Sequence, residues 1–147
     1  MQKSAIRALA RLDGQSYAET ICALVKSDIP GLSRTASAAL KQAKLPIDAR
    51  TLWDAIESGS DWLAKRNAIL LLRECDKWNQ LIYLLKAASL KDTRVGELAN
   101  TQIESWLRQY ETTWQYTPPD EQQKKELVSF SPESTVPPKL RQILAAI

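Results

Sequence analysis

The segment Trp78–Ser89, WNQLIYLLKAAS, has the clearest periodicity in the chain. Its apolar side chains fall at positions 78, 81, 82, 85 and 88, the spacing of one face of an α-helix. The same spacing recurs in Tyr17–Val25, Ala49–Ile56 and Val95–Leu107, and no stretch alternates with a period of two. The sequence therefore predicts an all-α fold made of amphipathic helices.

Local signals set the expected helix boundaries. Ser60 or Asp61 can cap the helix that follows it, because a side-chain oxygen accepts an otherwise unpaired backbone N–H. Pro30 suits the first turn of a helix, and Pro46 ends the segment before it. Short connections make successive helices antiparallel neighbours. We expect eight or nine helices, near residues 3–12, 16–27, 30–43, 48–58, 61–74, 77–90, 93–110, 120–130 and 138–146.

The composition agrees with a helical domain. Only 4 of the 147 residues are Gly and only 1 is Phe, while Leu, Ala, Ile and Lys are abundant. The net charge is +3, but residues 1–50 carry eight Lys or Arg against four Asp or Glu, which gives +4 for that third alone. This mildly basic third favours an acidic partner, although it falls short of the dense basic stripe of a nucleic-acid-binding protein.

Arginine and aspartate recur at nearly regular intervals. Arg7, Arg34, Arg66 and Arg94 each lie early in every second expected helix, and they are separated by 27, 32 and 28 residues. An aspartate precedes three of these arginines, at positions 28, 61 and 92. The clearest unit is 61–72, DWLAKRNAILLL, in which the aspartate is followed by arginine and then by small and apolar residues. We expect these aspartates and arginines to join adjacent repeats by hydrogen bonds and side-chain pairing.

These units resemble the first helix of a HEAT repeat, and the resemblance covers residues 28–110. It departs from the family pattern at Gly96, where alanine is usual, and residues 1–27 match only in outline. The family implies a right-handed superhelix of stacked antiparallel helix pairs that binds other proteins. We therefore expect one repeat domain over residues 1–147, with pairs at 3–27, 28–58, 61–90 and 92–130 and a capping segment at 131–147. Because one pair cannot bury both of its apolar stripes, stacking is what stabilises such a chain.

The N-terminal helix has apolar residues from its beginning, at Ala5, Ile6, Ala8, Leu9 and Leu12. A terminal repeat normally has a polar outer face. We therefore expect an exposed apolar surface at this end, as in a piece of a longer protein.

The residue types exclude most catalytic chemistry. The chain has no histidine, which removes the Ser-His and Cys-His pairs, the commonest general base and the usual metal ligand. Its four glycines form no phosphate-binding loop. Asp61 beside Trp62, or Asp54 beside Trp53, would be the only carboxylates placed for a glycosylase-like site, and neither has a basic, aromatic surrounding. We expect no enzyme activity, no cofactor and no metal.

The two cysteines, Cys22 and Cys75, lie in apolar helical segments and are expected to be buried free thiols rather than a disulfide. Free thiols suit a reducing compartment, and the longest fully apolar run, Ala68–Leu72, is too short for a membrane span. We therefore expect a cytoplasmic protein.

The five tryptophans divide into two groups. Trp53, Trp78 and Trp106 lie on core stripes, and Trp62 at a helix start is expected to be half-buried. Trp114 lies near Tyr110 and Tyr116. These aromatic residues either form an exposed patch or pack beneath the C-terminal segment, against Leu140, Ile143 and Leu144.

In such stacks the second helix of each pair lines the inner surface. Helical phase predicts that Ala23 and Ala87 point outward there, together with six candidate partner-binding residues: Glu19, Lys26, Arg50, Asp54, Gln80 and Tyr83. Their mixed charge favours a protein or peptide partner. Two alternatives remain open, a nucleic-acid-associated repeat that uses the basic N-terminal third and a regulatory or adaptor domain of a multi-subunit enzyme.

Overall fold

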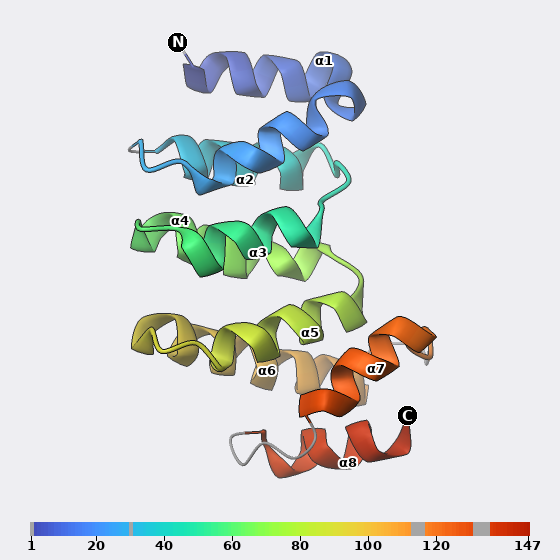
Figure 1. Ribbon diagram of the computed structural model, residues 1–147. Coiled ribbons are helices and arrows are strands. Elements are labelled where there is room, and N and C mark those ends of the chain that lie inside the picture. The colour runs from blue at the N-terminus through green and yellow to red at the C-terminus, as the bar shows by residue number, and fades with distance from the viewer. Residues whose placement is uncertain (1, 30, 113–116, 131–135) are drawn as a thin grey trace. The chain divides into compact units, whose positions relative to one another are not determined.

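The computed structural model describes residues 2–29, 31–112, 117–130 and 136–147. Within these residues it contains eight α-helices, two short 3₁₀ helices and no strand (Figure 1), so the all-α prediction is confirmed. The chain divides into two compact units, residues 1–76 and 77–147. The division falls inside the expected pair 61–90. Among the described residues, none of the helices combines the length and the hydropathy that a bilayer crossing requires.

Unit 1 contains four α-helices and both 3₁₀ helices. They are α1 (Gln2–Ala23), η1 (Leu24–Lys26), α2 (Leu32–Gln42), α3 (Ala49–Ser58), α4 (Trp62–Leu71) and η2 (Leu72–Glu74). The predicted segments at 16–27 and 61–74 are correct in extent, but each ends in a 3₁₀ turn rather than an α-helical one. Pro30 lies outside the described residues.

Helix α1 is two helical segments joined without a loop. Asp13 alone leaves the helical region, with φ −151° and ψ 56°, so the chain bends between Leu12 and Gly14. Gly14 is buried, and a Cβ there would meet the methyl groups of Leu45, so a larger residue would require the Leu45 side chain to shift. The predicted break between helices 3–12 and 16–27 is thereby confirmed at a single residue.

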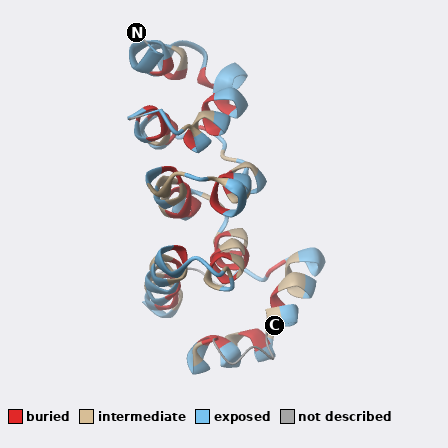
Figure 2. Cartoon of the chain, turned by 60° about the vertical axis from the view of Figure 1, so that its left-hand side comes forward, coloured by how far each residue is buried: buried red, intermediate tan, exposed pale blue. Residues whose placement is uncertain are grey.

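The helices of unit 1 form two layers. The first layer holds residues 2–12 of α1, then α2, then α4, because α2 contacts both α1 and α4. The second layer holds residues 14–26 and α3, which are joined by a hydrogen bond from Lys26 Nζ to Ser58 Oγ of 3.1 Å. Side chains between the layers are almost wholly buried (Figure 2), including Ile21, Val25, Ala36, Leu40, Leu52 and Ile56.

Unit 2 contains α5 (Lys77–Ala88), α6 (Thr93–Thr112), α7 (Glu121–Phe130) and α8 (Pro138–Ala146). Helices α5 and α6 are antiparallel, because Trp78 at the start of α5 meets Trp106 near the end of α6, with ring centroids 5.5 Å apart. Helix α7 packs on α5 and contacts α8. All four helices begin and end within two residues of the predicted boundaries.

An aromatic cluster forms part of the core of unit 2. Trp78 and Trp106 are each 1% exposed, and their indole N–H groups donate to the carbonyls of Thr117 and Lys77, at 2.7 and 2.8 Å. Tyr110 stacks on Trp106 at 5.1 Å. Trp78 and Trp106 therefore confirm the predicted core positions. Trp114 and Tyr116 lie outside the described residues, so the choice between a patch and a buried cluster stays open for them.

The exposure of two tryptophans and of the N-terminal apolar residues can be compared with the sequence predictions. Trp53 and Trp62 are both half-buried. On α1, Ile6 is buried, Leu9 is half-buried and Leu12 is 85% exposed. The expected exposed apolar surface therefore exists on one side of residues 2–12, while the other side packs on α2.

Removing the N-cap of α3 should destabilise unit 1. The carboxylate of Asp48 accepts hydrogen bonds from the backbone N–H of Arg50 and from Thr51 Oγ1, both at 3.0 Å. We expect Asp48→Ala to lower the free energy of unfolding by about 1 kcal/mol, because one of the orphan N–H groups loses its acceptor. Urea unfolding followed by circular dichroism measures this.

Asp48→Asn should retain most of the stability, and Asp54→Ala on the same helix is the matched control. The carboxylate of Asp54 caps no helix, although its charge is the same. An equal loss in Asp54→Ala would mean that charge, not capping, stabilises α3.

Candidate partner-binding surface

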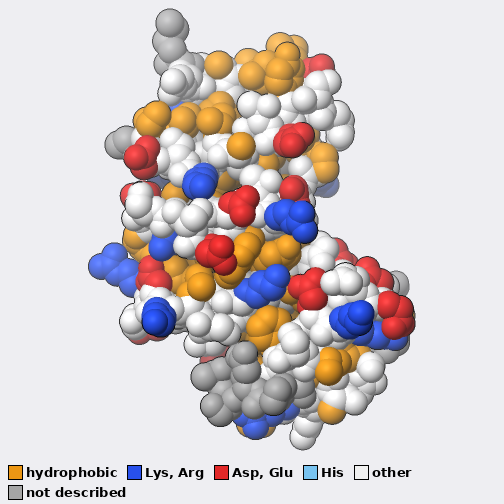
Figure 3. Space-filling view, in the orientation of Figure 1, with side chains coloured by type: hydrophobic (Ala, Val, Ile, Leu, Met, Phe, Trp, Pro, Cys, Tyr) orange, Lys and Arg blue, Asp and Glu red, His pale blue; other side chains and the backbone are white. Residues whose placement is uncertain are grey.

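The six predicted partner-binding residues divide between the two units. Glu19, Lys26, Arg50 and Asp54 belong to the second layer of unit 1, and all four are exposed as predicted. Figure 3 views unit 1 from the side on which α3 lies in front of α4, and acidic and basic side chains are interleaved there. This second-helix face, residues 14–26 and 49–58, carries Lys26 and Arg50 against Glu19, Asp54 and Glu57. Because positive and negative side chains alternate on this face, its charge favours neither an acidic nor a basic partner.

The prediction that Gln80 and Ala87 point outward is wrong. Gln80 is 4% exposed and Ala87 is fully buried. The reason is that seven of the twelve residues of α5 are buried and both α6 and α7 pack on this helix, so it has no continuous outer face. Tyr83 is half-buried, and the ammonium of Lys86 lies 4.8 Å from its ring centroid.

The opposite layer of unit 1 has a different charge pattern. We call the exposed side of residues 2–12, α2 and α4 the first-helix face. These three segments contain no aspartate or glutamate. They contain seven basic residues: Lys3, Arg7, Arg11, Arg34, Lys41, Lys65 and Arg66. Because acids are confined to the flanking turns, this face presents positive charge to solvent.

Two of the three recurring aspartates cap the helix that follows them, as expected for Asp61, rather than joining adjacent repeats. Asp61 accepts a 2.9 Å hydrogen bond from the N–H of Ala64, and Asp92 accepts from the N–H groups of Arg94 and Val95. The arginines of unit 1 differ from the expectation. Arg34 and Arg66 are exposed and form no ion pair or hydrogen bond with any described residue, so they do not join the repeats.

A groove of about 490 Å³ lies where the turns before α2 and α4 meet. Two apolar side chains line it with unusually high exposure, Ile29 at 50% and Leu63 at 62%. Arg34 and Arg66 line it as well, together with Asp28 and Asp61, so the groove carries both signs of charge. Its floor is fixed by polar contacts, since Asn67 Nδ2 donates to Ser33 Oγ at 3.0 Å. We call this cavity the Ile29–Leu63 groove.

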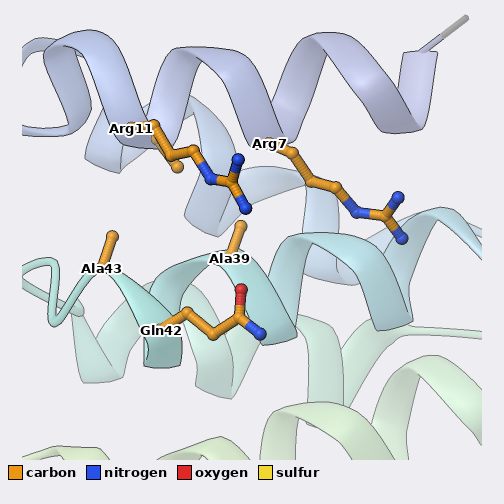
Figure 4. Close-up of a pocket in the computed structure, with 6 residues that line it drawn as sticks. Arg7, Arg11, Ala39, Gln42 and Ala43 are labelled. Atoms are coloured by element: carbon orange, nitrogen blue, oxygen red, sulfur yellow. The ribbon is translucent and has the colours of Figure 1, made fainter.

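A second cavity, of about 270 Å³, lies between α1 and the C-terminal half of α2. Arg11 reaches from α1 toward Ala39, whereas the side chain of Arg7 extends away from Ala39, Gln42 and Ala43 (Figure 4), and no acidic residue lines the cavity. The small alanine side chains leave room beside the guanidinium group of Arg11. We call this cavity the Arg7–Arg11 pocket.

The arginines of both cavities carried a signal in the sequence. Arg7, Arg34 and Arg66 recur at equivalent positions, and this recurrence was attributed to structure rather than to binding. A count of charges by helix would have separated the two layers, because the first-helix segments contain no acid. The pairing of Ile29 with Leu63 gave no such signal, because Ile29 lies in a turn and Leu63, in the first turn of α4, lies outside the apolar stripe.

The two carboxylates that adjoin a tryptophan in the sequence have different surroundings. Asp61 is engaged as the N-cap of α4, and Asp54 is exposed on α3. Among the described residues, no group of three or more His, Cys, Asp or Glu side chains is arranged to hold a metal ion.

The two cysteines are free thiols, Cys22 buried and Cys75 half-buried. Burial raises the pKa of both thiols, and for Cys22 a hydrogen bond from the Asp48 backbone partly offsets this rise. Repulsion from the thiolate form of Cys22 and from the carboxylate of Asp48 raises the pKa of Cys75 further, to about 12. At neutral pH both sulfurs are therefore protonated and poorly nucleophilic.

Alkylation should report this directly. We expect iodoacetamide to react slowly with Cys75 in the folded protein, at a rate that rises about tenfold per pH unit without levelling off below the pKa of about 12. In concentrated urea the rate should be higher and should level off above about pH 8.5, the ordinary thiol value. Mass spectrometry of each cysteine peptide measures both rates. A plateau near neutral pH in the folded protein would show a reactive thiolate instead.

In comparisons with known protein families, curated proteins and solved structures, none matches this chain. The arrangement of its charges and cavities is therefore the basis for assigning a function.

Proposed function

We propose that this chain is a non-catalytic helical-repeat module of HEAT-like architecture, and that unit 1 binds an acidic segment of a partner protein through its first-helix face. The observation that carries the proposal is the charge of that face. Seven basic residues and no acid lie on three neighbouring helical segments, and the arginines at both cavities have no partner among the described residues.

The repeat architecture is supported by the equivalence of α2 and α4. Residues 32 positions apart play the same part in the two helices: Arg34 and Arg66 are exposed, while Ala36 and Ala68 are fully buried. Such small buried residues let neighbouring helices approach closely. A repeated first helix with the same inner and outer sides is what a stacked array of helix pairs requires.

The unpaired arginines favour binding because an exposed guanidinium that stabilises nothing in the fold is available to another molecule. Arginine presents a planar fork of N–H donors that matches a carboxylate with two parallel hydrogen bonds. Four arginines, at positions 7, 11, 34 and 66, line the two cavities. An acidic ligand would therefore find several bidentate contacts within a single face.

A protein partner is favoured over a nucleic acid by the apolar residues of the same face. Ile29 and Leu63 are exposed beside the arginines. A phosphate backbone offers these side chains no apolar contact, whereas a polypeptide offers both carboxylates and apolar side chains. Interfaces of proteins combine an apolar centre with a charged rim in this way.

Charge reversal on the first-helix face should abolish most of the binding. The probes are a fluorescent peptide rich in Glu and Leu, a matched peptide with Lys in place of Glu, and single-stranded and duplex DNA. We expect only the acidic peptide to bind appreciably, with an affinity that falls as salt increases. The double variant R34E/R66E should weaken it about tenfold or more, since each reversal replaces an attraction by a repulsion. Fluorescence anisotropy measures the dissociation constants.

The matched control is K26E/R50E, which makes the same change in net charge on the second-helix face. It should alter the affinity by less than about twofold, because charges beyond a Debye length are screened. Equal losses in both variants would place the binding on no particular face. Tighter binding to DNA than to the acidic peptide would replace the proposed partner by a nucleic acid, and binding to no probe would overturn the proposal.

A further inference from the structure

The two cavities lie on opposite sides of α2 and at opposite ends of it. The Ile29–Leu63 groove adjoins its N-terminal end, through Gly31, Ser33 and Arg34. The Arg7–Arg11 pocket adjoins its C-terminal end, through Ala39 and Gln42. We propose that the partner segment crosses α2 as an extended chain, with one apolar side chain in the groove and a carboxylate in the pocket. This inference rests on the proposed function.

The groove suits an apolar side chain because its two most exposed lining residues are apolar. Ile29 comes from the turn before α2 and Leu63 from the first turn of α4, yet they line one cavity. Covering both with a single Leu-sized side chain removes apolar surface from water on both partners. Arg34 and Arg66 share this groove with Asp28 and Asp61, so its charges balance, and the carboxylate of the partner is assigned to the Arg7–Arg11 pocket, which no acid lines.

The pocket suits a carboxylate because both of its charged residues are basic. Arg7 and Arg11 are one helical turn apart, so their side chains lie on the same face of α1 (Figure 4). The side-chain amide of Gln42 adds a hydrogen-bond donor from the other wall. The volume of about 270 Å³ admits a side chain of the size of glutamate but is small for a folded element.

The geometry of α2 sets the spacing between the two ligand groups. Ser33 lines the groove, and position 41 lies at the centre of the pocket residues of α2, which are Ala39, Gln42 and Ala43. These two positions are eight residues apart, which corresponds to about 12 Å along the helix axis. The two cavities lie on either side of α2, about one interhelical distance of 8–10 Å apart. The diagonal is therefore about 15 Å, which an extended chain covers in roughly four to five residues. A helical segment would need about ten residues for the same distance.

A series of peptides tests the spacing. Each peptide has one Leu and two Glu residues, separated by one, three or eight serines. The short spacer cannot reach from groove to pocket, and the long one reaches only with a loss of chain entropy. We expect the peptide with three serines to bind about threefold more tightly than the long one and about tenfold more tightly than the short one. Titration of isotope-labelled full-length protein, followed by NMR, gives the affinities and the amides that shift.

A second comparison tests the anchor. Replacing the peptide's Leu by Ala should weaken binding about fivefold to the unaltered protein, but by less than about twofold to the Leu63→Ser variant. Val128→Ser is the matched control, because Val128 is an exposed apolar residue of unit 2, at 53%. That variant should bind both peptides as the unaltered protein does.

The outcomes separate the two proposals. If the acidic peptides bind at the first-helix face regardless of spacer and anchor, the crossing segment is wrong while the proposed function stands. If the Leu and Ala peptides bind equally well, the groove has no apolar anchor. If none of the peptides shifts an amide of unit 1, both the inference and the proposed function fail.

Discussion

The structure depends on the inability of any one of these short helices to bury its own apolar side. Helix α3 has only ten residues, yet Leu52, Ala55 and Ile56 are at most 1% exposed. Such burial requires cover from several elements, and α4, η1 and α1 all contact α3. Isolated helices of this length are marginal in water, so tertiary packing supplies most of their stability. The inner sides of the helices are therefore constrained, and the outer sides remain available for other uses.

This constraint explains why the fold was largely predictable from the sequence. Periodicity and capping located every described helix, including α8, whose bounds match the prediction. The side of a helix that is buried must be apolar, so it appears in the sequence as a periodic pattern of apolar residues. The failures occurred where more than one neighbour packs on a helix. Helical phase assumes a single buried side, so it assigned Gln80 and Ala87 to the outside of a helix that has two packing partners in its unit.

The candidate site was less predictable, for a different physical reason. A binding surface joins residues from separate turns, and sequence periodicity says nothing about which turns meet. Ile29 and Leu63 are 34 positions apart and belong to no apolar stripe, so only the parallel arrangement of α2 and α4 brings them together. The arginines, by contrast, were visible as a recurring position. Recurrence alone does not distinguish a binding role from a structural one, whereas the absence of a described partner does favour binding.

The unequal distribution of acids and bases over the helices is the main support for the proposed ligand-binding role of the first-helix face. Four aspartates, at positions 48, 61, 92 and 120, accept backbone N–H groups at helix N-termini, so the fold itself accounts for them. Such placement also stabilises the helix dipole. The arginines of α2 and α4 have no comparable structural use, because their guanidinium groups contact no described acceptor. Solubility alone does not explain this pattern, because any mixture of lysines and acidic residues on the surface would keep the protein soluble. Arginines that pair with no described acid, on helices that contain none, instead fit the proposed recognition of carboxylates on another chain.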